Sequence, residues 1–107
     1  MNRKEEIRRA AHELSKKLAD EGKLIEAGWA ILRGVAVSPD APQVQIDEMR
    51  MAYMAGAQHL FSSMISIMDP GEEPTDADLN RMDLIHRELE AWRKEMELRI
   101  QRAEDSA

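Results

Sequence analysis

Four side chains in one predicted helix have the chemistry of a polar binding site. They are Arg50, Tyr53, Gln58 and His59, in an otherwise apolar stretch over residues 48–62. An arginine guanidinium offers planar donors that suit phosphate or carboxylate, and tyrosine joins an apolar ring to a polar tip. An unpaired buried polar group costs about 1–3 kcal/mol, so each group needs a partner within the chain or on a ligand. We predict that these four residues form the contacts of a binding site.

Histidine and carboxylate chemistry would also allow an enzyme, but the spacing does not favour one. His59 could act as a base or a ligand, although a lone histidine within a helix is more often hydrogen-bonded structure. The sequence has no His-x-x-x-His, His-Glu-x-x-His or Glu-x-x-His spacing for a metal site. Glu73 and Asp76 match the Glu-x-x-Asp letters of helical nucleotide pyrophosphatases, but they fit the start of a helix better. We expect no catalytic residue, metal or cofactor; a small metal-dependent nucleotide hydrolase is the less favoured alternative.

Length and composition exclude several classes of protein. The 107 residues suit one helical domain over 1–107, and the absence of cysteine excludes disulfides and thiolate sites. The longest uncharged stretch, Met51 to Met68, contains glutamine, histidine and serines, so we expect no membrane span. The charged N-terminal segment does not resemble an export signal, which favours the cytoplasm. A net charge of −6 argues against non-specific binding of nucleic acid.

The spacing of apolar residues predicts an all-α fold. Steps of three and four recur almost throughout, which is typical of helices. We predict three long helices, at about 3–35, 42–68 and 76–103, in an up-down-up bundle. The apolar phase survives a gap at Glu21 and Gly22, which favours one continuous first helix, with a break near Asp20–Lys23 as the alternative. Asp40 is the predicted N-cap of the second helix.

The third predicted helix has the clearest start. Thr75 is its predicted N-cap, and Asp78 follows three residues later, as in a capping box. Its apolar residues then follow nearly strict heptad spacing: Leu79, Met82, Ile85, Leu89, Trp92, Met96 and Ile100. Three predicted ion pairs have the favourable i,i+4 orientation: Asp83–Arg87, Glu90–Lys94 and Glu95–Arg99. We expect residues 103–107 to fray, and both Trp29 and Trp92 to pack in the core.

The second predicted helix is apolar on nearly every side. A helix of this kind needs cover all round, and two flanking helices leave one face open. A second copy of the chain would close that face, so we expect a homodimer or a higher oligomer with this helix at the interface. Five of the eight methionines lie on it, and they could be core or an adaptable binding surface.

A resemblance covers about half of the chain, roughly residues 44–92. The segment from Glu48 to Phe61, Glu-Met-Arg-Met-Ala-Tyr-Met-Ala-Gly-Ala-Gln-His-Leu-Phe, resembles short uncharacterised all-helical proteins of phage and prophage accessory regions. The segment Asp69-Pro-Gly-Glu-Glu-Pro-Thr-Asp-Ala-Asp-Leu-Asn-Arg-Met extends the likeness. The pattern Arg50-x-x-Tyr53-x-x-Gly56-x-x-x-Leu60 is similar to a hairpin in phage proteins that sequester cyclic nucleotides. That likeness implies that Arg50 would meet phosphate and Tyr53 would stack on a base.

Together these features predict a non-catalytic, cytoplasmic helical binding protein. The resemblance implies a phage-type accessory factor that inhibits or sequesters a host or defence component. The alternatives are a structural or assembly accessory of a phage particle and a cyclic-nucleotide-sequestering protein. The expected partners are a second copy and another protein, or a nucleotide ligand, and not a membrane or non-specific nucleic acid.

Overall fold

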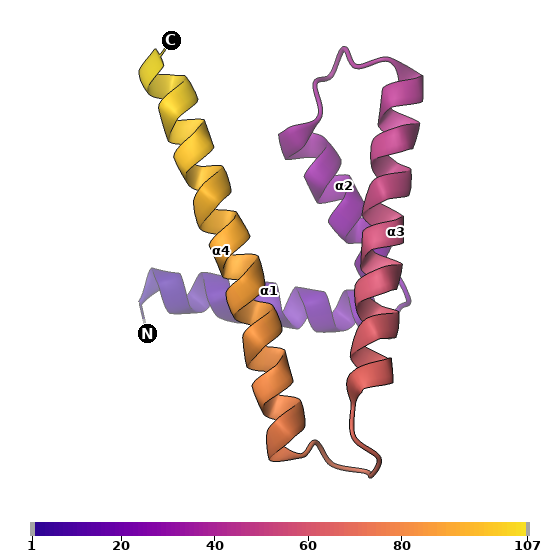
Figure 1. Ribbon diagram of the computed structural model, residues 1–107. Helices are drawn as coiled ribbons and strands as arrows, with labels where there is room; N and C mark the ends of the chain where they lie inside the picture. The colour runs from indigo at the N-terminus through magenta and orange to yellow at the C-terminus, as the bar shows by residue number, and fades with distance from the viewer. Residues whose placement is uncertain (1, 107) are drawn as a thin grey trace. The chain divides into compact units, whose positions relative to one another are not determined.

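The computed structural model describes residues 2–106, and these form helices and no strand, which confirms the all-α prediction. The helices are α1 (Arg3–Asp20), α2 (Leu24–Ala36), α3 (Gln43–Ile67) and α4 (Asp76–Ser106) (Figure 1). Contacts divide the chain into two compact units, one ending at Ser62 and one beginning at Ser63. None of the described helices is long and apolar enough to cross a membrane.

The prediction of one continuous helix over 3–35 is wrong, because the chain turns at Glu21–Lys23 and the helix count rises to four. Gly22 has a φ of 72°, in the left-handed region that favours glycine. The Gly22 amide donates to the Ala19 carbonyl at 3.0 Å, and the Lys23 amide donates to the Leu18 carbonyl at 2.8 Å. These two bonds form a Schellman motif, which satisfies the last carbonyls of α1. The alternative break near Asp20–Lys23 is therefore the correct one.

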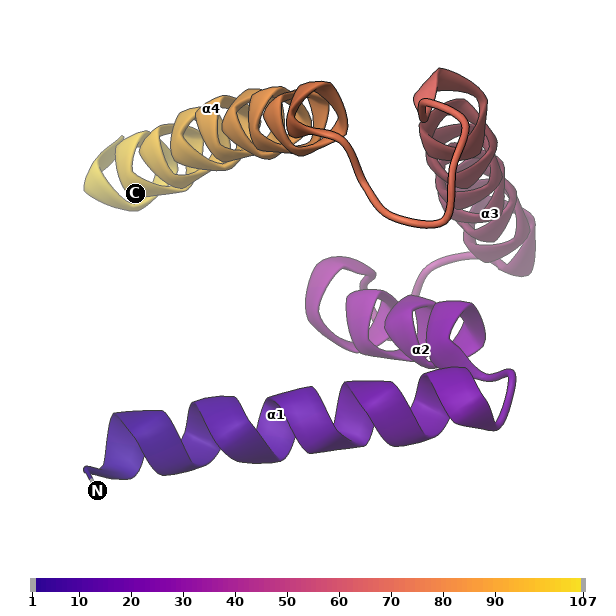
Figure 2. The same cartoon turned by 90° about the horizontal axis from the view of Figure 1, so that it is seen from below.

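The first unit has a small core where α2 packs against α3. Its buried apolar residues are Trp29, Val37 and Ile46, and Ala41, Met49, Tyr53 and Met54 pack around them. α1 joins the start of α2 at the turn (Figure 2) and contains no buried residue. The position of the first tryptophan in the core is thus confirmed, and the core is built from α2, α3 and the segment between them.

The second predicted helix begins later than its expected cap. α3 starts at Gln43, and the Ile46 amide donates to the Pro42 carbonyl at 3.2 Å. Pro42 therefore holds the N-cap position, because its carbonyl accepts the first bond of the helix. The Asp40 amide instead donates to the Ser38 hydroxyl at 3.3 Å. The prediction of Asp40 as the N-cap is wrong: Asp40 belongs to the turn that precedes the helix.

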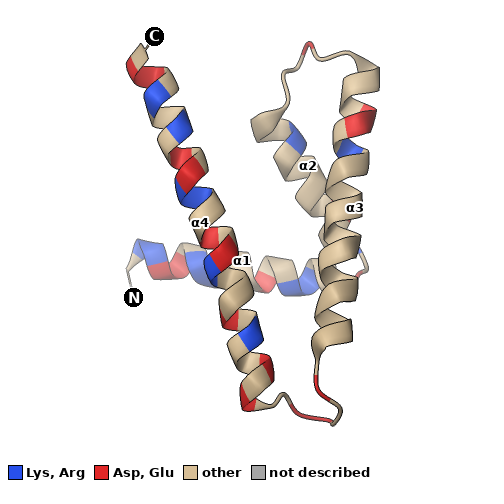
Figure 3. Ribbon diagram, viewed as in Figure 1, with Lys and Arg blue, Asp and Glu red and all other residues tan. Residues whose placement is uncertain are grey.

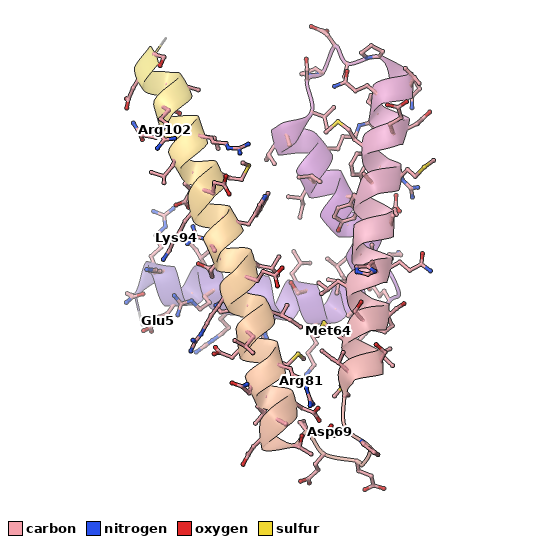
Figure 4. The ribbon with its side chains drawn as sticks, in the orientation of Figure 1. Glu5, Met64, Asp69, Arg81, Lys94 and Arg102 are labelled. Atoms are coloured by element: carbon pink, nitrogen blue, oxygen red, sulfur yellow. The ribbon has the colours of Figure 1, made fainter. Side chains whose placement is uncertain are left out.

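The second unit is organised by a polar cluster at the start of α4. The Asp78 amide donates to the Thr75 hydroxyl at 3.1 Å, and the Thr75 amide donates back to an Asp78 carboxylate oxygen at 3.1 Å. This reciprocal pair confirms the predicted capping box. Asp78 is only 3% exposed and also accepts from the Asp69 amide at 2.9 Å and from Arg81 at 2.9 Å. Asp69 and Arg81 come together at this turn (Figure 4).

Hydrogen bonds from the Asp69 and Thr75 amides, together with the nearby Arg81, hold the pKa of Asp78 below its ordinary 3.8. A carboxyl whose folded pKa is lowered stabilises the fold fully above its unfolded pKa. The contribution of Asp78 is therefore present above about pH 4 and is lost as the pH falls through the lower folded value.

Thr75→Ala is expected to lower the free energy of unfolding by about 1 kcal/mol, the usual cost of a lost N-cap. The variant removes the hydroxyl that accepts from the Asp78 amide and donates to Asp69 at 2.7 Å. Urea denaturation followed by circular dichroism measures the change. Thr75→Ser, which keeps the hydroxyl, is the control. Equal midpoints for Thr75→Ala and the parent chain would show that this cap does not stabilise the helix.

α4 carries its apolar residues largely in the open. Trp92 is 59% exposed and Leu89 is 52% exposed, so the prediction that Trp92 packs in the core is wrong. The heptad spacing correctly predicted the apolar stripe of α4, but it did not predict whether other residues of the chain cover that stripe. The Asp83–Arg87 and Glu95–Arg99 pairs form at 2.8 and 3.1 Å, whereas Glu90 pairs with Arg93 instead of Lys94. The helix continues to Ser106, beyond the predicted end at 103.

Candidate functional site on α3

Arg50 and Tyr53 both find partners on α2. An Arg50 guanidinium nitrogen lies 2.6 Å from a Glu26 carboxylate oxygen, and both side chains are largely exposed. The Tyr53 hydroxyl donates to the Ile25 carbonyl at 3.1 Å. The Tyr53 ring is tilted by 43° against Trp29, with the ring centres 6.0 Å apart. The two residues therefore join α3 to α2, and each has an internal partner of the kind that a polar group near a core requires.

Gly28 allows this close approach of α2 and α3. A Cβ built at Gly28 would overlap the Tyr53 hydroxyl oxygen. Only a residue without a side chain leaves room for the hydroxyl to reach the Ile25 carbonyl. Ile25, Glu26 and Gly28 are not among the predicted residues of the site. The sequence did contain a signal at Gly28. A glycine inside a helix lowers the stability of the helix by about 1 kcal/mol relative to alanine, so its presence indicates that a neighbouring group needs the space of a side chain.

Gln58 and His59 lie on exposed parts of α3. Within residues 2–106 the side chains of these two residues make no hydrogen bond to another group of the chain. Gln58 shares an open hollow of about 510 Å³ with Arg50; its other lining residues are Asp47, Met51, Met54 and Ala55. His59 lines neither this hollow nor the one beside it at the start of α2. The structure thus brings Arg50 and Gln58 together, places Tyr53 against the core and leaves His59 apart.

A second hollow of about 510 Å³ lies where the end of α1 and the start of α2 face α3. Its wall is mainly apolar and includes Leu24, Ile25, Met54, Ala57 and Phe61. Met54 and Gln58 line both hollows, so the two form adjoining parts of one surface on α3. We call this surface the α3 surface, defined by the residues that line the two hollows.

The charges of α3 lie near its start, and no charged residue follows Arg50 in the helix (Figure 3). Met51 is 70% exposed and Phe61 is 66% exposed in this uncharged part. In the part of the chain that the structure describes, no three His, Asp or Glu side chains converge where they could hold a metal ion. The arrangement can therefore supply apolar contact area with a guanidinium and an amide at its edge.

Comparison of the chain with known protein families, with curated proteins and with solved structures finds no match.

Proposed function

We propose that this protein is a non-catalytic helical binding protein that sequesters a protein partner through the α3 surface. The observation that carries the proposal is the uncharged, exposed part of α3 after Arg50. Exposed apolar surface rimmed by polar groups marks sites of interaction with other proteins. The methionines on this helix suit such a surface, because their flexible side chains adapt to the shape of a partner.

The resemblance of residues 44–92 to phage accessory proteins supports a narrower form of the proposal. In that form the partner is a host or defence component, bound in the cytoplasm and kept from acting. Sequestering of a cyclic nucleotide is less well supported, because the Glu26 carboxylate at 2.6 Å already occupies the Arg50 guanidinium. A phosphate approaching Arg50 would meet that negative charge.

We also propose that the chain works as a homo-oligomer and that a second copy completes an up-down-up helical bundle. Among residues 2–106, the first unit buries three apolar residues and the second unit buries none. Such thin cores favour completion by another chain. Light scattering at micromolar concentration is expected to give at least twice the chain mass of 12.2 kDa. A mass near 12.2 kDa would contradict this part of the proposal.

The α3 surface is tested by the double variant Arg50→Ala with Tyr53→Phe. The exposed Arg50–Glu26 pair is worth about 0–1 kcal/mol, and one hydrogen bond from the tyrosine hydroxyl about 0.5–1.5 kcal/mol. The double variant should therefore stay folded. If α3 binds the partner, capture of that partner from a bacterial host lysate should fall at least tenfold.

The matched control is Arg8→Ala, which removes an exposed arginine of α1 outside both hollows. It should leave both the stability and the captured protein unchanged. Capture that persists in the double variant while its melting temperature falls would show that Arg50 and Tyr53 only join the helices. Separate variants Gln58→Ala and His59→Ala then test the two predicted contacts that lack internal partners.

A further inference from the structure

The apolar stripe of α4 has the register of a coiled coil. Met82, Leu89 and Met96 occupy one heptad position (a), while Ile85 and Trp92 occupy the other (d). All five lie on the 31-residue helix α4, and none of them is buried. Helices with this repeat supercoil around each other, and the flanking e and g positions set partner and direction. The charges at those flanking positions therefore decide what can cover the stripe.

The flanking charges favour a parallel pair of identical helices. In a parallel pair, each g residue faces the e residue of the following heptad on the other helix. Glu88 at g would then face Arg93 of the partner subunit at e, and the symmetry gives two such attractive contacts. Glu88 forms no ion pair within residues 2–106. Its carboxylate is thus available to a second helix, where it would add to the contacts that Arg93 already makes with Glu90 and Glu97 of its own helix.

An antiparallel pair would place like charges opposite each other. Reversing one helix brings g residues against g residues, and keeping the apolar layers aligned sets Glu88 against Glu95 of the partner subunit. The same register sets Arg81 against Arg102 of the partner subunit. Like charges directly opposed weaken a pair of helices. Along the stripe, like charges are opposed in the parallel pair only where Arg99, at the next d position, faces its own copy. The antiparallel register opposes Glu88 to Glu95 and Arg81 to Arg102 of the partner subunit, so the flanking charges favour the parallel arrangement.

We propose that two copies of this chain associate through α4 as a parallel, two-stranded coiled coil. The inference rests on the proposed homo-oligomer and specifies which helix joins the copies and in which direction. This pairing places the contact between copies on the α4 stripe and not on the helix over 42–68, where the apolar pattern predicts it, and the α3 surface stays available to the partner.

The chain contains no cysteine, so single-cysteine variants report the pairing directly. In a parallel pair the two residues at position 82 are adjacent, and Met82→Cys should form a disulfide-linked dimer under mild oxidation. In the antiparallel register, position 82 faces position 99 of the partner subunit. The two copies of position 82 then lie about 25 Å apart along the helix axis, at a rise of 1.5 Å per residue. A disulfide needs Cα atoms within about 7 Å. The matched control is Lys94→Cys, at the f position of the repeat and so away from the a and d residues, which should not link.

A second variant tests the charges without altering the stripe. Glu88→Lys would place two positive charges together in the parallel pair but would face Glu95 of the partner subunit in the antiparallel pair. The dissociation constant of the dimer should therefore rise about tenfold if the pair is parallel. A fall in that constant would overturn the proposal.

Two other results would also overturn it: a heterodimer link between Met82→Cys and Arg99→Cys chains, or a dimer in which Met82→Cys chains do not link. The second result would leave the proposed homo-oligomer intact, because the doubled mass would remain. A trimeric or tetrameric mass would overturn the two-stranded form. A monomeric mass would overturn both the α4 pairing and the homo-oligomer, while capture by the α3 surface would stand separately.

Discussion

Trp29→Ala is expected to lower the free energy of unfolding by about 3–5 kcal/mol, the usual cost of truncating a buried aromatic side chain. Trp29 is 5% exposed and is one of three buried apolar residues in the chain's described part. Its ring also contacts Tyr53, so the truncation removes support from α3. Single domains have about 5–15 kcal/mol of stability in total. Urea denaturation followed by circular dichroism should show the midpoint falling sharply, with α2 and α3 melting together.

Trp92→Ala is the matched control, since it removes the same side chain from an exposed position on α4. Trp92→Ala should leave the stability of the first unit unchanged. If it lowers the midpoint of unfolding at all, the difference from the parent chain should grow with protein concentration, because Trp92 would act through the association of two chains. The loss in Trp29→Ala should not depend on concentration in this way. Equal midpoints for Trp29→Ala and the parent chain would show that the contact of α2 with α3 does not stabilise the protein.

Gly28→Ala is expected to destabilise the first unit by about 1–3 kcal/mol, the usual cost of overpacking. The added methyl group would overlap the Tyr53 hydroxyl, so the tyrosine must leave its bond to the Ile25 carbonyl and shift against Trp29. Alanine alone would favour the helix over glycine by about 1 kcal/mol. Because of the overlap, Gly28→Ala should lower the stability of the chain, whereas a change from glycine to alanine within a helix normally raises it.

Gly34→Ala provides the comparison, because it lies in the same helix and a Cβ there meets no atom within 4 Å. It should stabilise the chain by up to about 1 kcal/mol. Adding Tyr53→Phe to Gly28→Ala removes the overlapping oxygen and should restore part of the loss. Thermal melts of the three variants and the parent chain measure these differences. If both glycine variants gained stability, the close approach of the helices at Gly28 would be excluded.

Local signals predicted local structure well. Thr75 and Asp78 lie three residues apart, so the sequence contains the whole capping box and the start of α4 could be predicted from it. The turn at Gly22 was harder, because the apolar phase continues across it and a helix tolerates an isolated glycine at a cost of about 1 kcal/mol. Whether Gly22 stays helical or ends α1 depends on which arrangement satisfies the last carbonyls, and the Schellman bonds decide that.

Contacts between distant residues could not be predicted in the same way. The need of Arg50 and Tyr53 for partners follows from their chemistry, but Glu26 and Ile25 are 24 and 28 residues away in sequence. Nothing in the spacing identifies them before α2 is placed against α3. Trp29 and Trp92 occupy equivalent positions in their apolar stripes, yet one is buried and the other exposed. Periodicity shows which side of a helix is apolar, and the fold determines what covers that side.

The absence of buried residues in α1 has a consequence for the kinetics of the chain. α1 has 18 residues, little more than the length of about 12–15 residues below which an isolated helix is marginal in water, and the hydrogen bonds of such helices open and close within microseconds. The backbone amides of α1 should therefore exchange with deuterium through local opening, while those around Trp29 exchange only when the first unit opens. The Schellman turn at Gly22 separates these two regimes. α1 can thus unwind and reform while the contact between α2 and α3 stays closed.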